Sequence, residues 1–213
     1  VWDVASPNTA TSSNDLLTQY GAYRTSFNGD LAHLLALREG GEDAWLNTLC
    51  NGQASFRMGF SQIYANYSSV PTYSWSVEVV THEEGHNMGS PHTHACAWNG
   101  NSTAIDGCGP AAGYVEGTCP QGPIPSPAVG GTIMSYCHLV SAGINFANGF
   151  GPQPAALIVG NVNAASCLAV CGTTCDPSTS LGATDVTVNS ATLNWASTGA
   201  TASSGPSRIR RPR

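Results

Sequence analysis

The chain contains no lysine and few charged residues of either sign. Of its 213 residues, 9% are charged, and all seven basic residues are arginines. Four of these arginines lie in the last six residues, so residues 1–205 carry thirteen acidic side chains against three arginines, a net charge of −10. An acidic body without a basic stripe repels phosphate, which excludes nucleic acid as the expected partner.

Long apolar runs are also missing. No segment approaches the roughly 18 consecutive apolar residues that a membrane-spanning helix needs, so we expect no membrane span. The chain has no signal-peptide pattern and begins at Val1 without a methionine. We therefore expect that a preceding segment has been removed.

Eight cysteines stand out against this background, at positions 50, 96, 108, 119, 137, 167, 171 and 175. They are even in number and lie mostly in loops rich in Gly, Pro and Asn, which predicts disulfides and an extracellular compartment. Eight cysteines allow about one hundred pairings, and the sequence does not choose among them. A zinc site on Cys167, Cys171 and Cys175 is the alternative, but the paired C-x-x-C knuckles of such sites are missing.

Residues 82–92 carry the most specific chemical pattern, H-E-x-x-H-x-x-G-x-x-H. His82 and His86 are four residues apart, so on a helix their imidazoles lie one turn apart on the same face and can share a metal ion. Gly89 favours the left-handed conformation that ends such a helix, and His92 can then supply a third nitrogen. The pattern predicts a Zn²⁺ ion with three protein ligands and one open position.

Glu83 is the expected general base. An open position on zinc holds a water whose pKa falls to about 7. Glu83 is rotated by about 100° from His82 on a helix, so its carboxylate should reach this water rather than the metal. A helix with unrelated histidines is the alternative, but the eleven-residue pattern is far more specific than H-E-x-x-H alone. His94 is the alternative third ligand if His92 does not bind.

A second pattern lies about forty residues further on, where Met134 sits in the apolar segment 131–137. This segment resembles the Met-turn of the metzincin zinc peptidases, whose signature pairs such a turn with the long histidine motif. The resemblance implies that Met134 lies beneath the histidines without binding the metal. In some metzincins a tyrosine placed like Tyr136 is an additional, displaceable ligand, although a packed aromatic is the favoured interpretation here.

Within the metzincins the chain is most similar to the reprolysin (adamalysin-like) group, through residues 30–35, 44–50 and 81–89. Thr93 departs from that group, which usually has an aspartate after the third histidine. The resemblance covers about residues 1–170 and implies a mixed α/β (α+β) catalytic domain. This fold has a twisted sheet with an antiparallel edge strand, an active-site helix, and an irregular lower subdomain stapled by disulfides. The strand expected over residues 30–37 would be that antiparallel edge, where an extended substrate pairs.

Local patterns predict the remaining elements of this domain. A helix is expected over residues 16–23, capped by Asn14 or Asp15. Residues 40–53 are expected to form a glycine-rich loop and residues 54–76 irregular structure, followed by the active-site helix over about residues 75–88. Turns should dominate residues 93–131, and a helix with proline in its first turn should cover residues 152–165. His33 is expected to be an ordinary polar residue of its strand.

The chain is expected to divide into three parts. Residues 1–175 would form the catalytic domain, without some amino-terminal elements that the resemblance implies. Residues 176–199 alternate apolar and polar side chains and are similar to the first two strands of a fibronectin type III domain. Residues 200–213 would be a disordered basic tail.

These observations predict a secreted, monomeric zinc endopeptidase that acts on proteins or peptides, with Glu83 as its catalytic residue. A binding or adhesion module, or an inactive fragment of a larger metalloprotease, is the alternative. Glu83 distinguishes the two, because a scaffold has no need of a general base. The sequence does not identify the substrate-binding residues.

Overall fold

The computed structural model describes residues 12–37, 41–66 and 68–168, and the backbone of three strands in residues 179–210. The chain divides into two compact units, residues 1–168 and 169–213. Within the described residues, no helix is long and apolar enough to cross a bilayer.

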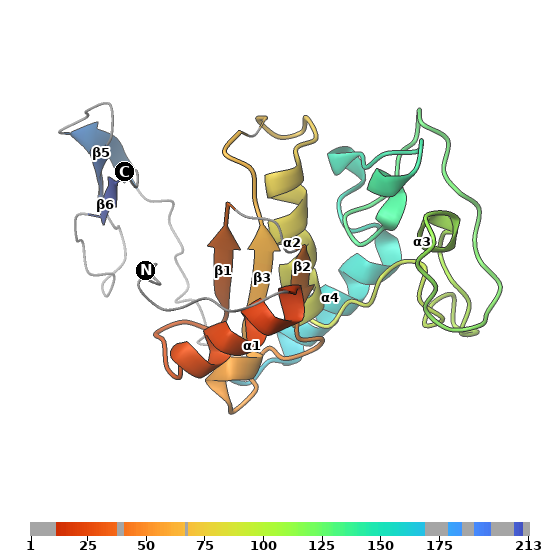
Figure 1. Ribbon diagram of the computed structural model, residues 1–213, viewed down its shortest axis with the longest axis horizontal. Coiled ribbons are helices and arrows are strands. Elements are labelled where there is room, and N and C mark those ends of the chain that lie inside the picture. The colour runs from red at the N-terminus through yellow and green to blue at the C-terminus, as the bar shows by residue number, and fades with distance from the viewer. Residues whose placement is uncertain are drawn as a thin grey trace. The chain divides into compact units, whose positions relative to one another are not determined.

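The first unit combines helices with a small sheet, which confirms the predicted mixed α/β class (Figure 1). Its helices and strands, in chain order, are α1 (Ser13–Tyr23), β1 (Ala32–Ala36), β2 (Glu42–Ala44), β3 (Met58–Gln62), α2 (Trp75–Asn87), α3 (Cys108–Ala111) and α4 (Pro152–Ala164). Three short 3-10 helices complete it, at Ala54–Phe56, Tyr136–Leu139 and Phe146–Asn148.

The sheet has the order β1-β3-β2, with β3 in the middle (Figure 1). β1 pairs with β3 in parallel, whereas β2 pairs with β3 antiparallel. The predicted strand over residues 30–37 therefore exists, but its predicted orientation is wrong. The antiparallel edge strand is β2, which lies in the segment expected to be a loop, and β3 occupies a segment expected to be irregular.

The alternation of side chains along β3 places one helix on each face of the sheet. Met58 and Phe60 are fully buried and pack against Leu16 and Leu17 of α1. On the opposite face, the Ser61 hydroxyl donates to the carbonyl of Val79 in α2, at 3.4 Å. Because side chains alternate between the faces of a strand, these contacts fix which side of the sheet carries α2.

The two predicted helices at the ends of this unit are confirmed, with one correction. α1 is capped by Ser12, whose hydroxyl accepts from the Asp15 amide at 3.1 Å, and not by Asn14 or Asp15. α4 has proline at its start, where the missing N–H is tolerated.

The predicted active-site helix, α2, is held at both ends. At its start, the Trp75 indole N–H donates to the carbonyl of Gln62 at 2.8 Å. At its end, Gly89 has a φ of +103°, the positive value expected there. The Asn161 amide of α4 donates to the Met88 carbonyl at 2.8 Å, so α4 caps α2 where the chain turns toward His92.

Disulfides staple the remainder of the unit, as the cysteine count predicted. The described residues contain three bridges, Cys50–Cys167, Cys96–Cys119 and Cys108–Cys137. Cys167 is therefore not available to a zinc ribbon, and Cys171 and Cys175 lie outside the described residues. The segment from residue 93 to 131 has little regular structure beyond α3, and two of the bridges begin in it.

The second unit contains three antiparallel strands in the order β4-β5-β6. β4 (Thr179–Thr184) and β5 (Ser190–Ala196) lie where two fibronectin-like strands were expected. β6 (Ser207–Arg210) lies in the segment expected to be without regular structure. The fibronectin type III resemblance and the three-part division of the chain stay predictions.

Candidate metal centre

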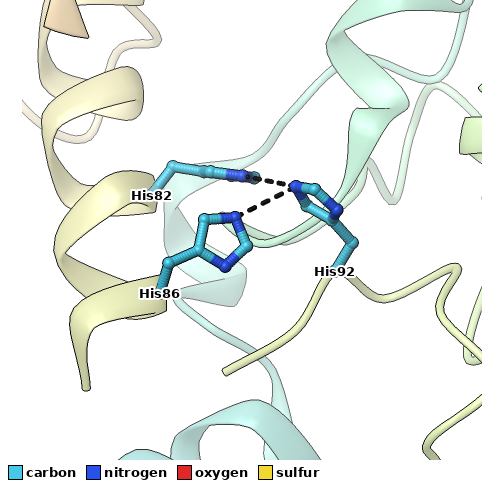
Figure 2. A group of neighbouring side chains, drawn as sticks. All are labelled: His82, His86 and His92. Atoms are coloured by element: carbon cyan, nitrogen blue, oxygen red, sulfur yellow. Dashed lines mark hydrogen bonds between the residues drawn. The ribbon is translucent and has the colours of Figure 1, made fainter. Parts of the chain in front are cut away.

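The three histidines of the long motif converge on one point. His82 and His86 project from α2, and His92 approaches them from the loop that follows the helix (Figure 2). The Nε2 atom of His92 lies 3.0 Å from Nε2 of His86 and 3.1 Å from Nε2 of His82. The structure therefore brings together the three residues that the sequence predicted as metal ligands.

Each of these histidines has an acceptor for its other ring nitrogen. Nδ1 of His82 lies 2.6 Å from the carbonyl oxygen of Ile133, and Nδ1 of His86 lies 2.7 Å from that of Ser90. Nδ1 of His92 lies 2.5 Å from a carboxylate oxygen of Glu116. Because only an N–H can donate to these oxygens, Nδ1 carries a hydrogen in each of the three rings, and the Nε2 atoms face one another.

This arrangement fits a metal ion. Burial lowers the pKa of His86 to about 4 and that of His82 well below its ordinary value, with the neighbouring histidines adding to both shifts. Both rings are therefore neutral near pH 7, and their Nε2 atoms have no hydrogen to share. Lone pairs at such short separations repel one another unless a cation lies among them, and neutral imidazole is a preferred ligand of zinc.

Glu83 lies beside the histidine cluster without joining it. Its side chain is buried and borders a cavity of about 270 Å³ that His86 and His92 also line. Burial raises the pKa of Glu83 well above its ordinary value, and the carboxylates of Glu42, Asp43 and Glu78 raise it further. A carboxyl group with a raised pKa holds a proton more readily, as a group that shuttles protons must.

Met134 is fully buried beneath α2. Its sulfur occupies the space above Gly85, where an added Cβ would lie only 2.6 Å away. The next residue back, Ile133, provides the carbonyl that orients His82. The predicted Met-turn therefore contacts the helix that carries two of the histidines, and it fixes one of them.

Thr93 stands where reprolysins usually have an aspartate, and it forms hydrogen bonds to the Met-turn. Its backbone N–H and its hydroxyl both donate to the Met134 carbonyl, at 3.0 and 3.3 Å. A buried carboxylate is nevertheless present: Asp106 accepts from the Ser135 hydroxyl at 2.8 Å. Thr93 and Asp106 thus connect the turn to the irregular segment that follows α2.

Tyr136 and His94 flank the third histidine. The Tyr136 ring centroid lies 4.5 Å from that of His92, so the side chain is close to the cluster, and its role as an auxiliary ligand stays a prediction. His94 stacks on His92 with ring centroids 5.0 Å apart. His94 groups with His92 and Glu116 rather than with the two helix histidines, and its buried nitrogens have no hydrogen-bond partner among the described residues.

Three acidic residues at the site, Glu42, Asp43 and Glu116, were not identified from the sequence. Glu116 comes 24 residues after His92 in an irregular loop, and no local pattern marks it. The hydrogen bond from His92 lowers the pKa of Glu116, so this residue is a carboxylate. Glu42 belongs to β2, and together with Asp43 and Ala44 it borders the cavity beside the histidines.

The comparison with protein families agrees with this geometry. The model of metallopeptidase family M12, of the reprolysin type, matches residues 1–145. Searches of the curated proteins and of the solved structures found no significant match. The family match covers both α2 with its histidine motif and the Met-turn beneath it, and the chain therefore belongs to metallopeptidase family M12.

Proposed function

We propose that this chain is a secreted zinc endopeptidase. The observation that carries the proposal is the convergence of three histidine Nε2 atoms, two of whose rings line the cavity that the buried Glu83 also lines. His82, His86 and His92 would hold the ion. Bound zinc supplies Lewis acidity, which lowers the pKa of a water and polarises the scissile carbonyl.

Glu83 performs the proton transfers. Its carboxylate takes one proton from the attacking water, whose oxygen forms a bond to the carbonyl carbon. The protonated Glu83 then delivers this proton to the nitrogen of the leaving amine as the C–N bond breaks. One water is consumed, a carboxyl group and an amine are released, and Glu83 returns to its starting state.

The position of the edge strand supports a peptide substrate. β2 is the outer strand of the sheet and borders the cavity that contains Glu83. Its outward backbone groups pair with no other strand among the described residues. An extended peptide that paired with β2 would therefore lie across the histidine cluster.

The bridges between cysteines support the proposed extracellular location, since disulfides persist in oxidising compartments. We propose that the peptidase acts as a monomer. The binding or adhesion module remains the second candidate, and it predicts metal binding without peptide hydrolysis.

The Glu83→Gln variant tests the proposal. Glutamine keeps the size of the side chain but cannot take the proton, so zinc content should be unchanged while hydrolysis falls by about 10²–10⁴-fold. Hydrolysis of casein and gelatin is measured near neutral pH, with a chelator control and with zinc quantified in each protein.

The matched control is Glu84→Gln, which makes the same change at the next, partly exposed glutamate. This variant should retain both zinc and activity. Equal cleavage by Glu83→Gln and the unchanged protein would refute the role of Glu83. Zinc binding without cleavage by the unchanged protein would favour the binding module.

A further inference from the structure

A second cavity, of about 420 Å³, adjoins the metal centre. It shares Glu42 and Tyr136 with the cavity that contains Glu83 and the histidines. Its volume falls within the range of roughly 300–1,000 Å³ that is typical of ligand sites. A substrate side chain close to the scissile bond can therefore reach it.

Aromatic rings form most of the wall of this second cavity. They belong to Tyr64, Tyr73, Trp75, Tyr114 and Tyr136. The Tyr64 and Trp75 ring centroids are 6.4 Å apart, and those of Tyr114 and Tyr136 are 5.2 Å apart. The face of an aromatic ring carries partial negative charge and attracts cations, most strongly where water is excluded.

The strand register directs Glu42 toward this side of the sheet. Glu42 pairs with Ser61, which faces α2, whereas Asp43 pairs with Phe60, which faces α1. Paired residues of neighbouring strands project to the same face. Asp43 accordingly accepts a hydrogen bond from Asn14 of α1, while the Glu42 carboxylate makes no hydrogen bond to a described residue and interacts electrostatically with His92.

The environment of Glu42 favours a cationic partner. Burial raises the pKa of Glu42, because its carboxylate is partly shielded from water. No arginine among the described residues lines the cavity, and the chain contains no lysine. The one histidine in the wall, His138, is neutral near pH 7 because burial lowers its pKa. A poorly solvated carboxylate among aromatic faces gains most from a positive charge beside it.

We infer that this cavity binds the side chain of an arginine or lysine next to the scissile bond of the substrate. Glu42 would pair with the cationic end, and the tyrosine and tryptophan rings would pack against the aliphatic stem and the charge. Glu42 is then the residue that determines specificity. The inference rests on the proposed peptidase function and adds the class of side chain that it selects.

A set of quenched peptides tests this assignment. The peptides share an alanine background and differ at one position, which holds arginine, lysine, citrulline, norleucine or glutamate. Citrulline matches the shape of arginine without its charge. We expect kcat/KM to be about tenfold higher for the arginine peptide than for the citrulline peptide. Mass spectrometry of the products should place the cleaved bond beside the variable residue.

The Glu42→Gln variant should abolish this ratio. Because the Glu42 carboxylate also raises the pKa of Glu83, the ratio of the two peptides within each protein is compared, and not the absolute rate. Glu84→Gln, an identical change outside both cavities, should keep the ratio. Equal cleavage of the arginine and citrulline peptides by the unchanged protein would overturn the inference, and the peptidase function would stand.

Binding is measured separately in the zinc-loaded Glu83→Gln variant, by titrating tryptophan fluorescence with the arginine and citrulline peptides. Trp75 lines the cavity, so the signal change should be lost in a Trp75→Phe version. Tighter binding of the arginine peptide supports the inference even if the unchanged protein cleaves nothing, a result that would refute the peptidase function alone. Equal binding of both peptides overturns the inference.

Discussion

Among the described residues, Glu116 is the side chain that accepts a hydrogen bond from a histidine of the cluster. Backbone carbonyls accept from His82 and His86, so substitution cannot remove those two hydrogen bonds. His92 instead donates to the Glu116 carboxylate, which is partly exposed on its own loop. The orientation of the third histidine therefore depends on a residue that can be changed without altering α2.

Zinc affinity should fall in the Glu116→Ala variant. Loss of the acceptor frees the His92 ring and lowers its basicity, and such losses typically cost about 10–100-fold in metal affinity. Glu116→Gln should have a smaller effect, because its amide oxygen is a neutral acceptor. The dissociation constant is measured by competition with a chromophoric chelator.

The Glu84→Gln variant again serves as control, since it removes a partly exposed carboxylate from α2 itself. Its zinc affinity should equal that of the unchanged protein. An unaltered affinity in Glu116→Ala would show that the loop holds His92 without its carboxylate partner.

The sequence identified the central residues of the site because they lie within one local pattern. Histidines four residues apart meet on any helix, and the eleven-residue motif also includes Glu83 and the glycine turn. The residues that contact this motif lie far from it in the sequence. Glu116 reaches His92 only through the folding of a loop stapled by Cys96–Cys119, and Glu42 reaches the cavity only through strand register.

At the scale of elements, α2 and the Met-turn approach each other closely at Gly85. This residue lies inside a helix, where glycine is unfavourable by about 1 kcal/mol relative to alanine. An added Cβ would lie 2.6 Å from the Met134 sulfur and 2.9 Å from the Phe150 ring. The absence of a side chain at Gly85 therefore permits this contact.

The Gly85→Ala variant should be less stable, despite the better helix propensity of alanine. The methyl group must displace the fully buried Met134 and the partly buried Phe150. Overpacking of this kind typically costs about 1–3 kcal/mol in the free energy of unfolding. Urea denaturation measures the change, and zinc affinity should weaken with it because the Met-turn also orients His82.

Gly160→Ala in α4 is the matched control. Gly160 is exposed, and an added Cβ would meet no atom within 4 Å. The substitution should therefore raise the free energy of unfolding by about 0.5–1 kcal/mol. A gain of the same size in Gly85→Ala would contradict the close approach of Met134.

The helices of the fold were more predictable than its strands, for physical reasons. α2 and α4 carry their own start and stop signals in proline, glycine and the spacing of histidines. β2 has only three residues, and β3 contains a glycine and a serine that face a helix rather than a purely apolar core. Such strands are stabilised by long-range pairing, which local sequence does not specify.

At the scale of the whole molecule, disulfides connect segments that have little regular structure. Cys50–Cys167 joins the loop after β2 to the chain just after α4 and closes a sequence separation of 117 residues. Cys96–Cys119 closes a separation of only 23 residues. A cross-link restricts the unfolded chain more when the loop it closes is longer.

Removal of the longer bridge should therefore cost more stability. Paired Cys→Ser substitutions at Cys50 and Cys167 should lower the free energy of unfolding by about 1 kcal/mol more than the same substitutions at Cys96 and Cys119. Urea denaturation is carried out with a chelator present, so that altered zinc binding does not contribute. An equal or reversed order would indicate that contacts in the folded state, rather than loop length, determine the contribution of each bridge.

The placement of the bridges has a consequence for the order in which the enzyme matures. His82 and His86 lie together on one helix, whereas Glu116 and Met134 belong to segments joined by Cys96–Cys119 and Cys108–Cys137. A helix forms in about a microsecond, but disulfides take seconds or longer. We therefore expect two histidines to be in place early and tight zinc binding to follow thiol oxidation, an order that pulsed alkylation with and without zinc would reveal. A newly made chain in a reducing compartment would then be harmless to the proteins around it.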